Sequence, residues 1–269
     1  PVARMGIETT WVNGSEPGAM ATAVIPGRTM LVIAETPSNP ILDIVDLDEL
    51  GAIKGPFTMV DSTLATPFGQ QPIRHGVDLV LHSATKGIAG HNDTTLGVVS
   101  GEQELLEDIW RYGILHGASA SPFDAMLALR GVRTLDVRQQ RQSDTALAVA
   151  TRLAAHSAIK AVHYPGLPEH PQHDRAAAQM IRFGSVVSFQ MSDGDGFARL
   201  VERLNLLRCA TSFGGPETLI CEPWTTTHSG LDEDARRELG IHPGLVRMSI
   251  GLEDVDDLWH DLDRSLSSI

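Results

Sequence analysis

Lysine is rare in this sequence, and one lysine stands directly behind an apolar segment. The chain has three lysines, Lys54, Lys86 and Lys160, and Lys86 follows the segment LVLHSAT among small residues. An exposed lysine is protonated at neutral pH and is a poor nucleophile, whereas a confined lysine beside cationic or apolar groups can lose its proton and form an imine with an aldehyde. The surroundings of Lys86 fit the second case.

Three further side chains could act together with Lys86. Asp61 lies 25 residues earlier at the end of an apolar segment, where a carboxylate is costly unless it faces a cation such as a protonated pyridine nitrogen. Ser83 and Thr85 carry hydroxyls that suit a phosphate. An amine, a carboxylate and phosphate donors together are what pyridoxal phosphate requires. The alternative is a solvated Lys86 after a strand and an Asp61 that caps a helix.

Short apolar segments alternate with helical patterns in the first half of the chain, which predicts a parallel sheet with crossover helices. The predicted strands are residues 29–36, 57–63, 77–84 and 95–101, and the predicted helices are residues 46–54 and 102–116. The first three strands end in polar or small residues, among them Asp61 and Ser83. Because ligands of open α/β sheets bind beyond the carboxyl ends of the strands, these ends are expected to converge on one site.

A long helix over about residues 121–156 is predicted to join two domains. Pro122 suits its first turn, and Gly131 is a point at which it can bend. The pattern then predicts a smaller α+β domain, with strands over 159–164, 185–191 and 245–250 and helices over 174–181, 196–204 and 255–266. The expected domains are residues 1–135, as the C-terminal part of a larger α/β domain, and residues 136–269.

The composition argues against several classes of partner. The 269 residues carry a formal charge of -13 without a basic stripe, which opposes binding to nucleic acid. No apolar run approaches the roughly 18 residues of a membrane helix, and the first residues lack the features of a secretory signal. A cytoplasmic protein without a membrane partner is therefore expected. Cys209 and Cys221 form no metal or redox pair and fit reduced, buried thiols.

Seven motifs along the chain are similar to those of one enzyme family and occur in the same order. They are AETPSNP (34–40), VDSTLATP (60–67), HSATKGIAGHND (82–93), SPFDAMLALRGVRTL (121–135), YPGLPEHPQH (164–173), SFGGPETLI (212–220) and LVRMSIGLED (245–254). The chain thus resembles, over essentially its full length, the cystathionine γ-synthase and γ-lyase family of Cys/Met-metabolism pyridoxal-phosphate enzymes, which includes methionine γ-lyase. The resemblance implies the α/β fold of aspartate aminotransferase-type transferases, with a mostly parallel sheet in the large domain and a smaller α+β C-terminal domain. It also implies pyridoxal 5'-phosphate as the cofactor.

The resemblance gives roles to the residues that match the family's motifs. Lys86 resembles the lysine that bonds the cofactor and then moves protons, and Asp61 resembles the carboxylate that keeps the ring nitrogen protonated. The other residues that the resemblance places at the cofactor are Ser83 and Thr85 at the phosphate, Thr63 beside the ring and Asn39 near the ring hydroxyl.

At the substrate, Arg247 resembles the arginine whose fork grips the α-carboxylate bidentately, with Ser212 as its helper and Asn39 nearby. Thr211 stands where many family members have a glutamate that pairs with the distal amino group of cystathionine. Threonine cannot form that ion pair. The resemblance therefore favours a smaller substrate, such as methionine or homocysteine.

The activity that the resemblance implies is that of a carbon–sulfur lyase, performing γ-elimination on methionine, homocysteine or cystathionine. The alternative is a γ-replacement enzyme, either a cystathionine γ-synthase or an O-acylhomoserine sulfhydrylase. The family forms homodimers paired into homotetramers, with active sites shared between subunits. Its members carry a longer N-terminal part, with a phosphate loop and a cofactor-stacking tyrosine that are not found in this sequence. A fragment, and with it a non-catalytic assembly module, is therefore a hypothesis of another class.

Several histidines suggest other roles. His163, His170 and His173 lie close together in the sequence, so a metal site has to be considered. The prolines among them favour an irregular structural loop without the helical spacing of a zinc pair, and we expect no metal. His91 is expected to cap a turn rather than to touch substrate. His228 could lie near the mouth of the substrate site.

Overall fold

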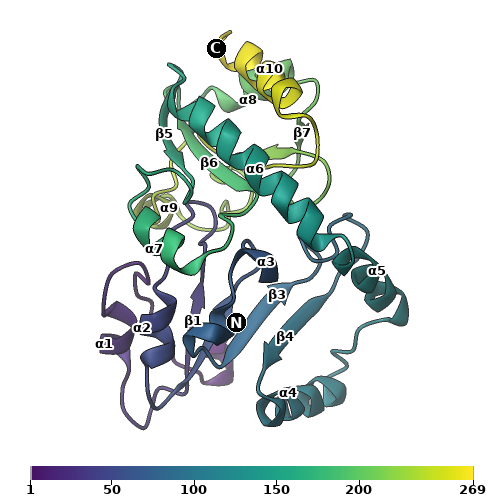
Figure 1. The fold of residues 1–269 in the computed structure, drawn as a ribbon. Coiled ribbons are helices and arrows are strands. Elements are labelled where there is room, and N and C mark those ends of the chain that lie inside the picture. Colours follow the sequence, from purple (N-terminus) through teal and green to yellow (C-terminus); the bar gives the residue numbers. More distant parts are fainter. Residues whose placement is uncertain (1, 269) are drawn as a thin grey trace.

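The computed structural model describes residues 2–268 and is built around two β-sheets (Figure 1). Within these residues the first sheet has the order β1-β2-β3-β4, formed by β1 (Leu31–Glu35), β2 (Phe57–Asp61), β3 (Leu79–Ser83) and β4 (Gly97–Gly101). The second has the order β5-β6-β9-β8-β7, formed by β5 (Ile159–His163), β6 (Val186–Met191), β7 (Arg208–Cys209), β8 (Leu219–Cys221) and β9 (Leu245–Ser249). Each sheet is thus made from one half of the chain.

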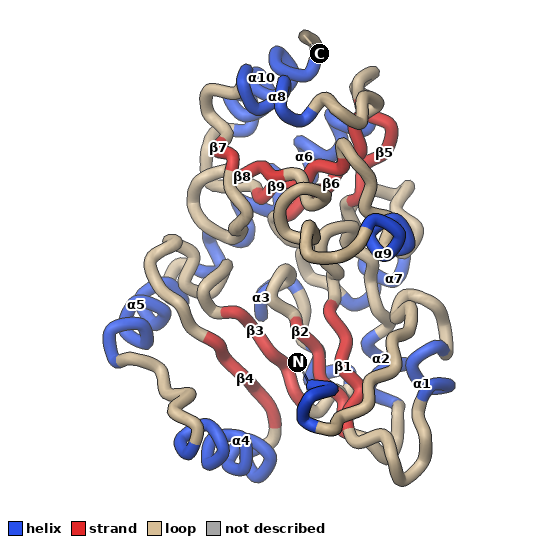
Figure 2. The backbone as a smooth tube through the Cα atoms, turned by 180° about the vertical axis from the view of Figure 1, so that it is seen from behind, coloured by secondary structure: helices blue, strands red, loops and turns tan. Residues whose placement is uncertain are grey.

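The first sheet is mostly parallel, which confirms the predicted fold class. β1, β2 and β3 run in the same direction, and β4 pairs with β3 in the opposite direction. Figure 2 shows the four strands side by side, with β4 at the edge of the sheet. In the parallel part Glu35 lies opposite Asp61, and Asp61 lies opposite Leu81. The carboxyl ends of the three strands therefore meet at one edge of the sheet, where Glu35, Asp61 and Ser83 stand.

Short helices flank the first sheet. Leu47 and Leu50 of α2 (Leu47–Ala52) are fully buried and pack with Ala34 of β1 and Val60 of β2. The helix begins at Asp46, whose side chain accepts a hydrogen bond from the backbone N–H of Glu49 at 3.0 Å. The other helical segments of this half are η1 (Val2–Met5), α1 (Ala19–Ala23), α3 (Thr66–Gly69), η2 (Pro72–His75) and α4 (Gln103–Leu115).

The helix predicted over residues 121–156 is divided in two. α5 (Pro122–Val132) is followed by α6 (Leu135–Ala154), and between them Thr134 departs from helical geometry with φ −115° and ψ 4°. A Cβ at Gly131 would lie 2.7 Å from the carbonyl carbon of Ala89, so only glycine allows this close approach. The Thr134 hydroxyl also donates to the carbonyl of Gly131 at 3.2 Å. The prediction of one continuous helix was wrong because these local contacts end α5.

The largest core lies between the second sheet and α6. Val149 and Leu153 of α6 are buried and pack with Phe189 of β6 and Val246 of β9. α10 (Val255–Leu266) adds Leu258, Leu262 and Leu266 to the same core. The remaining helices of this half are α7 (His173–Gln179), α8 (Phe197–Arg203) and α9 (Glu233–Glu238).

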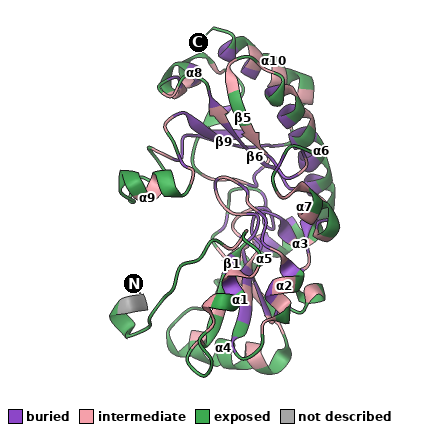
Figure 3. Cartoon of the chain, turned by 90° about the vertical axis from the view of Figure 1, so that its left-hand side faces the viewer, coloured by how far each residue is buried: buried purple, intermediate pink, exposed green. Residues whose placement is uncertain are grey.

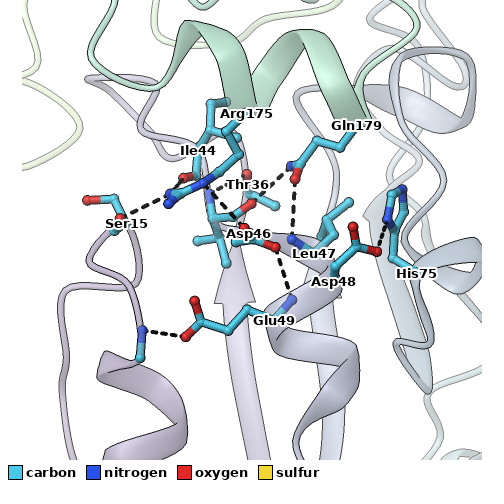
Figure 4. Close-up of polar contacts among 12 residues, drawn as sticks. Ser15, Thr36, Ile44, Asp46, Leu47, Asp48, Glu49, His75, Arg175 and Gln179 are labelled. Carbon is cyan, nitrogen blue, oxygen red and sulfur yellow. Dashed lines mark hydrogen bonds and ion pairs between the residues drawn. The ribbon is translucent and has the colours of Figure 1, made fainter.

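Hydrogen bonds from α7, in the second half of the chain, join it to the segment after β1 in the first half (Figure 4). Arg175 donates to the carbonyl of Ile44 at 2.8 Å. Gln179 spans two backbone groups, donating to the carbonyl of Val45 at 2.9 Å and accepting from the N–H of Leu47 at 3.2 Å. The segment after β1 therefore serves as the docking edge for the second half. The predicted domain boundary near residue 135 stays a prediction.

Several large apolar residues of the first half are exposed, and Figure 3 colours α4, which carries some of them, mainly as exposed. On α4, Trp110 and Leu115 are 65% and 82% exposed, and Phe123 and Leu129 of α5 are also exposed. Large apolar side chains exposed in this way can belong to a surface that contacts another chain. Within residues 2–268, no helix combines the length and the apolar character needed to cross a membrane.

Candidate active site

Thr63 ties together the ends of the strands that carry Asp61 and Ser83. The backbone N–H and the hydroxyl of Thr63 both donate to Asp61 Oδ1, at 3.0 and 2.5 Å. The backbone N–H of Ser83 in turn donates to the Thr63 hydroxyl at 2.8 Å. Asp61 is the last residue of β2 and Ser83 is the last residue of β3, so the parallel register places both at the same edge. The Asp61 carboxylate is therefore held in one orientation.

A cavity of about 380 Å³ opens at this edge. It is lined by Asp61, Leu81, His82, Ser83, Thr85, Thr95, Leu96 and Gly97. Thr85 also lines a second cavity of about 490 Å³, together with Asn92, Asp93, Thr94, Thr95, Asp124 and Ser212. The hydroxyl of Thr85 accepts from the N–H of Leu96 at 2.9 Å. Thr85 thus lies where the carboxylate side of the site meets the side that holds Ser212.

Lys86 is half-buried in the turn that follows β3. Its amine donates to the hydroxyl of Ser212 at 3.0 Å. Burial, and then the nearby Arg247 guanidinium, lower the pKa of Lys86 below its ordinary value. This is the physical condition that makes a lysine amine available as a nucleophile or base.

Arg247 on β9 is a buried cation, only 2% exposed. Its Nη1 donates to Asn39 Oδ1 at 2.9 Å, and its Nη2 donates to the carbonyls of Thr211 and Ser212. Asn39 comes from the segment after β1, whereas Thr211 and Ser212 precede β8. The guanidinium is therefore fixed by both halves of the chain, and buried arginines with this planar fork are suited to bidentate carboxylates.

All nine residues predicted for the site lie in this connected region. Hydrogen bonds join Asp61, Thr63 and Ser83 into one group. A second hydrogen-bonded group consists of Lys86, Ser212, Thr211, Arg247 and Asn39. Thr85 lines both cavities, the first with Asp61 and Ser83 and the second with Ser212. Their proximity could not be predicted from the sequence alone, because residues such as Asn39 and Arg247 are 208 positions apart in the chain. Their roles at a cofactor and a substrate stay predictions.

Two titratable residues of the site received no role in the prediction. Glu35 lies opposite Asp61 across β1 and β2. The residue keeps exposed surface, but desolvation by the surrounding protein, and then the Asp61 charge, raise the pKa of Glu35 to about 7. His82 is buried and lines the cavity beside Asp61, and its Nδ1 has no hydrogen-bond partner. Burial lowers the pKa of His82. Both residues lie near the carboxyl ends of predicted strands, within 29–36 and 77–84, so the strand alignment was the signal that could have found them.

The remaining histidines have local partners. Nδ1 of His91 lies 2.7 Å from the carbonyl of Ala89, which fits the expected turn. His170 is buried and its Nδ1 accepts from the N–H of Gln172 at 3.2 Å. Burial, then the neighbouring His163 and His173, lower the pKa of His170 to about 4. Among the residues that the structure describes, no group of three His, Cys, Asp or Glu is arranged to hold a metal ion.

His228 is half-buried in the loop between β8 and α9. Burial, and then the charge of Arg247, lower the pKa of His228, while the backbone of Asn39 raises it. Since Arg247 and Asn39 are bonded to each other in the site, these influences agree with the predicted position of His228 near its mouth.

Comparison with known proteins gives one consistent family. The family model described as Cys/Met metabolism PLP-dependent enzyme matches residues 1–267. Cystathionine gamma-synthase of Mycobacterium tuberculosis is 42% identical over 268 residues, covering 98% of this chain and 68% of that protein. L-methionine gamma-lyase of Fusobacterium nucleatum is 40% identical over 273 residues, covering 99% of this chain and 69% of the relative.

Other relatives and solved structures agree with this result. Tobacco chloroplastic cystathionine gamma-synthase 1 is 40% identical, with 99% of this chain covered but 50% of the relative. The crystal structure of a cystathionine gamma-lyase from Lactobacillus plantarum complexed with L-serine has a TM-score of 0.96 and 34% identity, covering 100% of this chain and 71% of that one. The chain thus spans from half to about seven-tenths of the length of the proteins that it matches.

Proposed function

Because the chain belongs to the Cys/Met metabolism family of pyridoxal-phosphate-dependent enzymes, we propose that it forms part of a carbon–sulfur lyase acting on a sulfur-containing amino acid. The reaction class is γ-elimination of the methionine, homocysteine or cystathionine type. The observation that carries this proposal is the contact between a half-buried lysine amine and the hydroxyl of Ser212, whose carbonyl accepts from the buried Arg247. An amine and a carboxylate-binding fork are the two groups that an amino-acid substrate needs side by side.

The site fits pyridoxal 5'-phosphate. Lys86 would anchor the cofactor, and Asp61, oriented by Thr63, would face the ring nitrogen from the cavity of about 380 Å³. Ser83 and Thr85 line the same cavity and would supply hydroxyls to the phosphate, and Asn39 would lie near the ring hydroxyl. When bound, this cofactor supplies an electron sink for the substrate's bonding electrons.

The protein's own residues then orient the amino acid and move its protons. Arg247 would hold the α-carboxylate with two parallel hydrogen bonds, assisted by Ser212 and Asn39. Lys86, once released from its anchoring role, would take the proton from Cα and transfer protons at the side-chain carbons, for which a lowered pKa is required. Thr211 offers no carboxylate to a distal ammonium group, which favours methionine or homocysteine over cystathionine.

Substrate turnover by the full-length protein tests this proposal. We expect release of 2-oxobutyrate and a thiol from methionine or homocysteine, and loss of the cofactor's visible absorption band in Lys86→Ala. A retained band in that variant would contradict the role of Lys86.

γ-Replacement is the second candidate, because two of the relatives, at 40% and 42% identity, are gamma-synthases. With O-acetylhomoserine or O-succinylhomoserine as substrate, formation of cystathionine when cysteine is added, or of homocysteine when sulfide is added, with release of the carboxylic acid and no keto acid, would favour it. The third hypothesis, a non-catalytic assembly module, predicts that the 269-residue chain alone associates with itself but binds no pyridoxal phosphate. Size-exclusion chromatography with added cofactor decides that question.

We further infer that the protein assembles as a homodimer or homotetramer with shared active sites. The exposed Trp110, Leu115, Phe123 and Leu129 on α4 and α5 support this, since large apolar side chains that are buried against another chain in an assembly stand exposed in the isolated chain. Light scattering on the full chain and on Trp110→Glu/Leu115→Glu should show the variant dissociating. An unchanged mass would place the interface elsewhere.

A further inference from the structure

Two cations of the site, Lys86 and Arg247, lie close together, and the groups that accept hydrogen bonds from them are neutral. Lys86 and Arg247 are near enough for the arginine charge to lower the pKa of Lys86, and both contact the same short segment, residues 211–213. The Lys86 amine donates to the Ser212 hydroxyl at 3.0 Å, whereas Arg247 donates to the carbonyls of Thr211 and Ser212. These acceptors carry no full charge. Glu35 and Cys221 also act on Arg247, whereas the groups that shift the pKa of Lys86 include no carboxylate, so part of the repulsion at the lysine is left uncompensated.

The third residue of this segment faces both cations. The Phe213 ring centroid lies 5.0 Å from the Lys86 amine nitrogen and 5.4 Å from Cζ of Arg247. Both distances are within the roughly 6 Å over which the negative face of an aromatic ring attracts a cation. One ring therefore interacts with the two charged groups on which the proposed chemistry depends.

The position of this ring is fixed from two sides. Phe213 packs against the large core of the second half. Next to it, Gly214 has a positive φ of 80°, and a Cβ there would lie 2.5 Å from the backbone nitrogen of Gly87. The 212–214 backbone thus rests directly on the backbone of the Lys86 turn. A ring held in this way cannot move far from the lysine without disturbing both contacts.

We propose that Phe213 is a positioning residue whose ring holds the Lys86 amine and the Arg247 guanidinium beside each other by offsetting their mutual repulsion. The inference rests on the proposed function in one respect: it takes Lys86 as the base and Arg247 as the group that binds the substrate carboxylate. Two consequences follow. Without the ring, the charged form of Lys86 is less stable, so its pKa falls further. Arg247 also loses a contact and binds the substrate carboxylate less well.

The first test measures Lys86 directly in the full chain freed of cofactor with hydroxylamine. Lysines are reductively methylated with ¹³C-formaldehyde, and the resonance that is absent in Lys86→Arg is followed through a pH titration. Phe213→Leu keeps an apolar side chain but removes the aromatic face, whereas Phe213→Tyr keeps the face. We expect the midpoint to fall by about half a pH unit or more in Phe213→Leu and to stay near wild type in Phe213→Tyr. Equal midpoints in wild type and Phe213→Leu, or equal shifts in the two variants, would overturn the proposal.

The second test separates positioning from packing in the cofactor-loaded protein. Phe213→Leu should raise KM for the amino-acid substrate about tenfold, with a smaller change in kcat, and Phe213→Tyr should restore KM. Thermal unfolding of each variant shows whether the fold is intact. A KM increase in both variants, with the Lys86 midpoint unmoved, would mean that the side chain only fills space. If no sulfur amino acid is turned over by wild type while the midpoint still shifts, the proposed function fails and the inference about Phe213 stands.

Discussion

The Asp61 carboxylate is oriented before any ligand arrives, because Thr63 supplies it with two hydrogen bonds. Asp61→Asn keeps the size and an acceptor oxygen but removes the charge that the proposed pyridinium partner requires. We expect turnover by the cofactor-loaded enzyme to fall about 100-fold or more, measured as kcat/KM. Asp78→Asn is the matched control, since Asp78 accepts from the N–H and hydroxyl of Thr58 outside the site. Equal losses in both variants would show that the effect of Asp61→Asn comes from structural damage.

Glu35 makes a prediction about pH. Although Glu35 keeps exposed surface, desolvation by the surrounding protein, and then the charge of Asp61, raise its pKa in the folded protein to about 7, against an ordinary value of 4.5. Between these two values the folded chain holds a proton that the unfolded chain has lost, so this residue's contribution to stability falls as pH rises from 4.5 to about 7. Glu35→Gln removes the effect. In urea unfolding of the cofactor-free chain, the stability of Glu35→Gln relative to wild type should rise across this window.

The exposed Glu104 on α4 gives the control for that measurement. Glu104→Gln should follow the wild-type curve throughout. A constant difference between Glu35→Gln and wild type from pH 4.5 to 7 would mean that Glu35 titrates in the folded chain as it does in the unfolded chain.

At the scale of single residues, the sequence indicated which side chains could do chemistry better than it indicated which side chains lie next to one another in the fold. Lys86, Asp61 and Arg247 were found because each has a distinctive chemistry within a motif. Phe213 gave no such signal, because an apolar residue in a loop looks like any other until its partners, 127 and 34 residues away, are brought to it. Long-range packing decides which apolar side chain faces a cation.

At the scale of the elements, a side chain of α6 donates hydrogen bonds to the backbone of the turn that follows Lys86. Arg138 is 5% exposed, and its guanidinium donates to the carbonyls of Gly87 at 2.8 Å, Ile88 at 3.2 Å and Gly131 at 2.9 Å. It also donates to the Thr134 hydroxyl at 3.1 Å. A single buried side chain thus joins the Lys86 turn to the junction of α5 and α6.

Arg138→Met tests this connection. The variant leaves several buried carbonyls without donors, so we expect it to lower the free energy of unfolding by about 2–4 kcal/mol. Arg141→Met, at an exposed position of the same helix, should cost less than about 1 kcal/mol. Urea unfolding of both variants provides the comparison. A similar small loss in both would mean that the carbonyls of the turn find water when Arg138 is removed.

The predicted elements were most accurate where apolar periodicity is strong. The prediction of strand 245–250 and helix 255–266 agrees closely with β9 and α10, because β9 is a continuous run of buried residues and the buried residues of α10 recur at helical spacing. β7 and β8 span two and three residues, too short to show a pattern. The division between α5 and α6 was missed since it comes from contacts with Ala89 and Arg138, which no helical pattern contains.

For the whole molecule, the site exists only where the two halves meet. Lys86 and Asp61 come from the first sheet, and Ser212 and Arg247 come from the second half. The bond between Asn39 and Arg247 crosses this boundary, as do the contacts of Arg175 with Ile44. Anything that weakens the packing between the halves should therefore weaken the site as well.

His170 lies at this boundary, since its ring is buried in the loop before α7 and also contacts the backbone of Leu42. Its pKa of about 4 means that, between pH 6.5 and 4, the unfolded chain binds a proton that the folded chain does not. Stability is therefore lost as pH falls through this range, by about 2–3 kcal/mol for this residue. The direction is opposite to that of Glu35.

We expect His170→Gln to lose less stability than wild type between pH 7.5 and 4, measured by urea unfolding of the full chain. His260→Gln, at an exposed position of α10, should lose as much as wild type. If His170→Gln and wild type lose stability in parallel, the proton must be taken up elsewhere, and His163, whose pKa burial also lowers, is the next residue to replace. A second outcome is that His170→Gln loses less stability than wild type at low pH and also keeps more of its activity there. Acid inactivation then begins at the contact between the halves rather than at the carboxylates of the site.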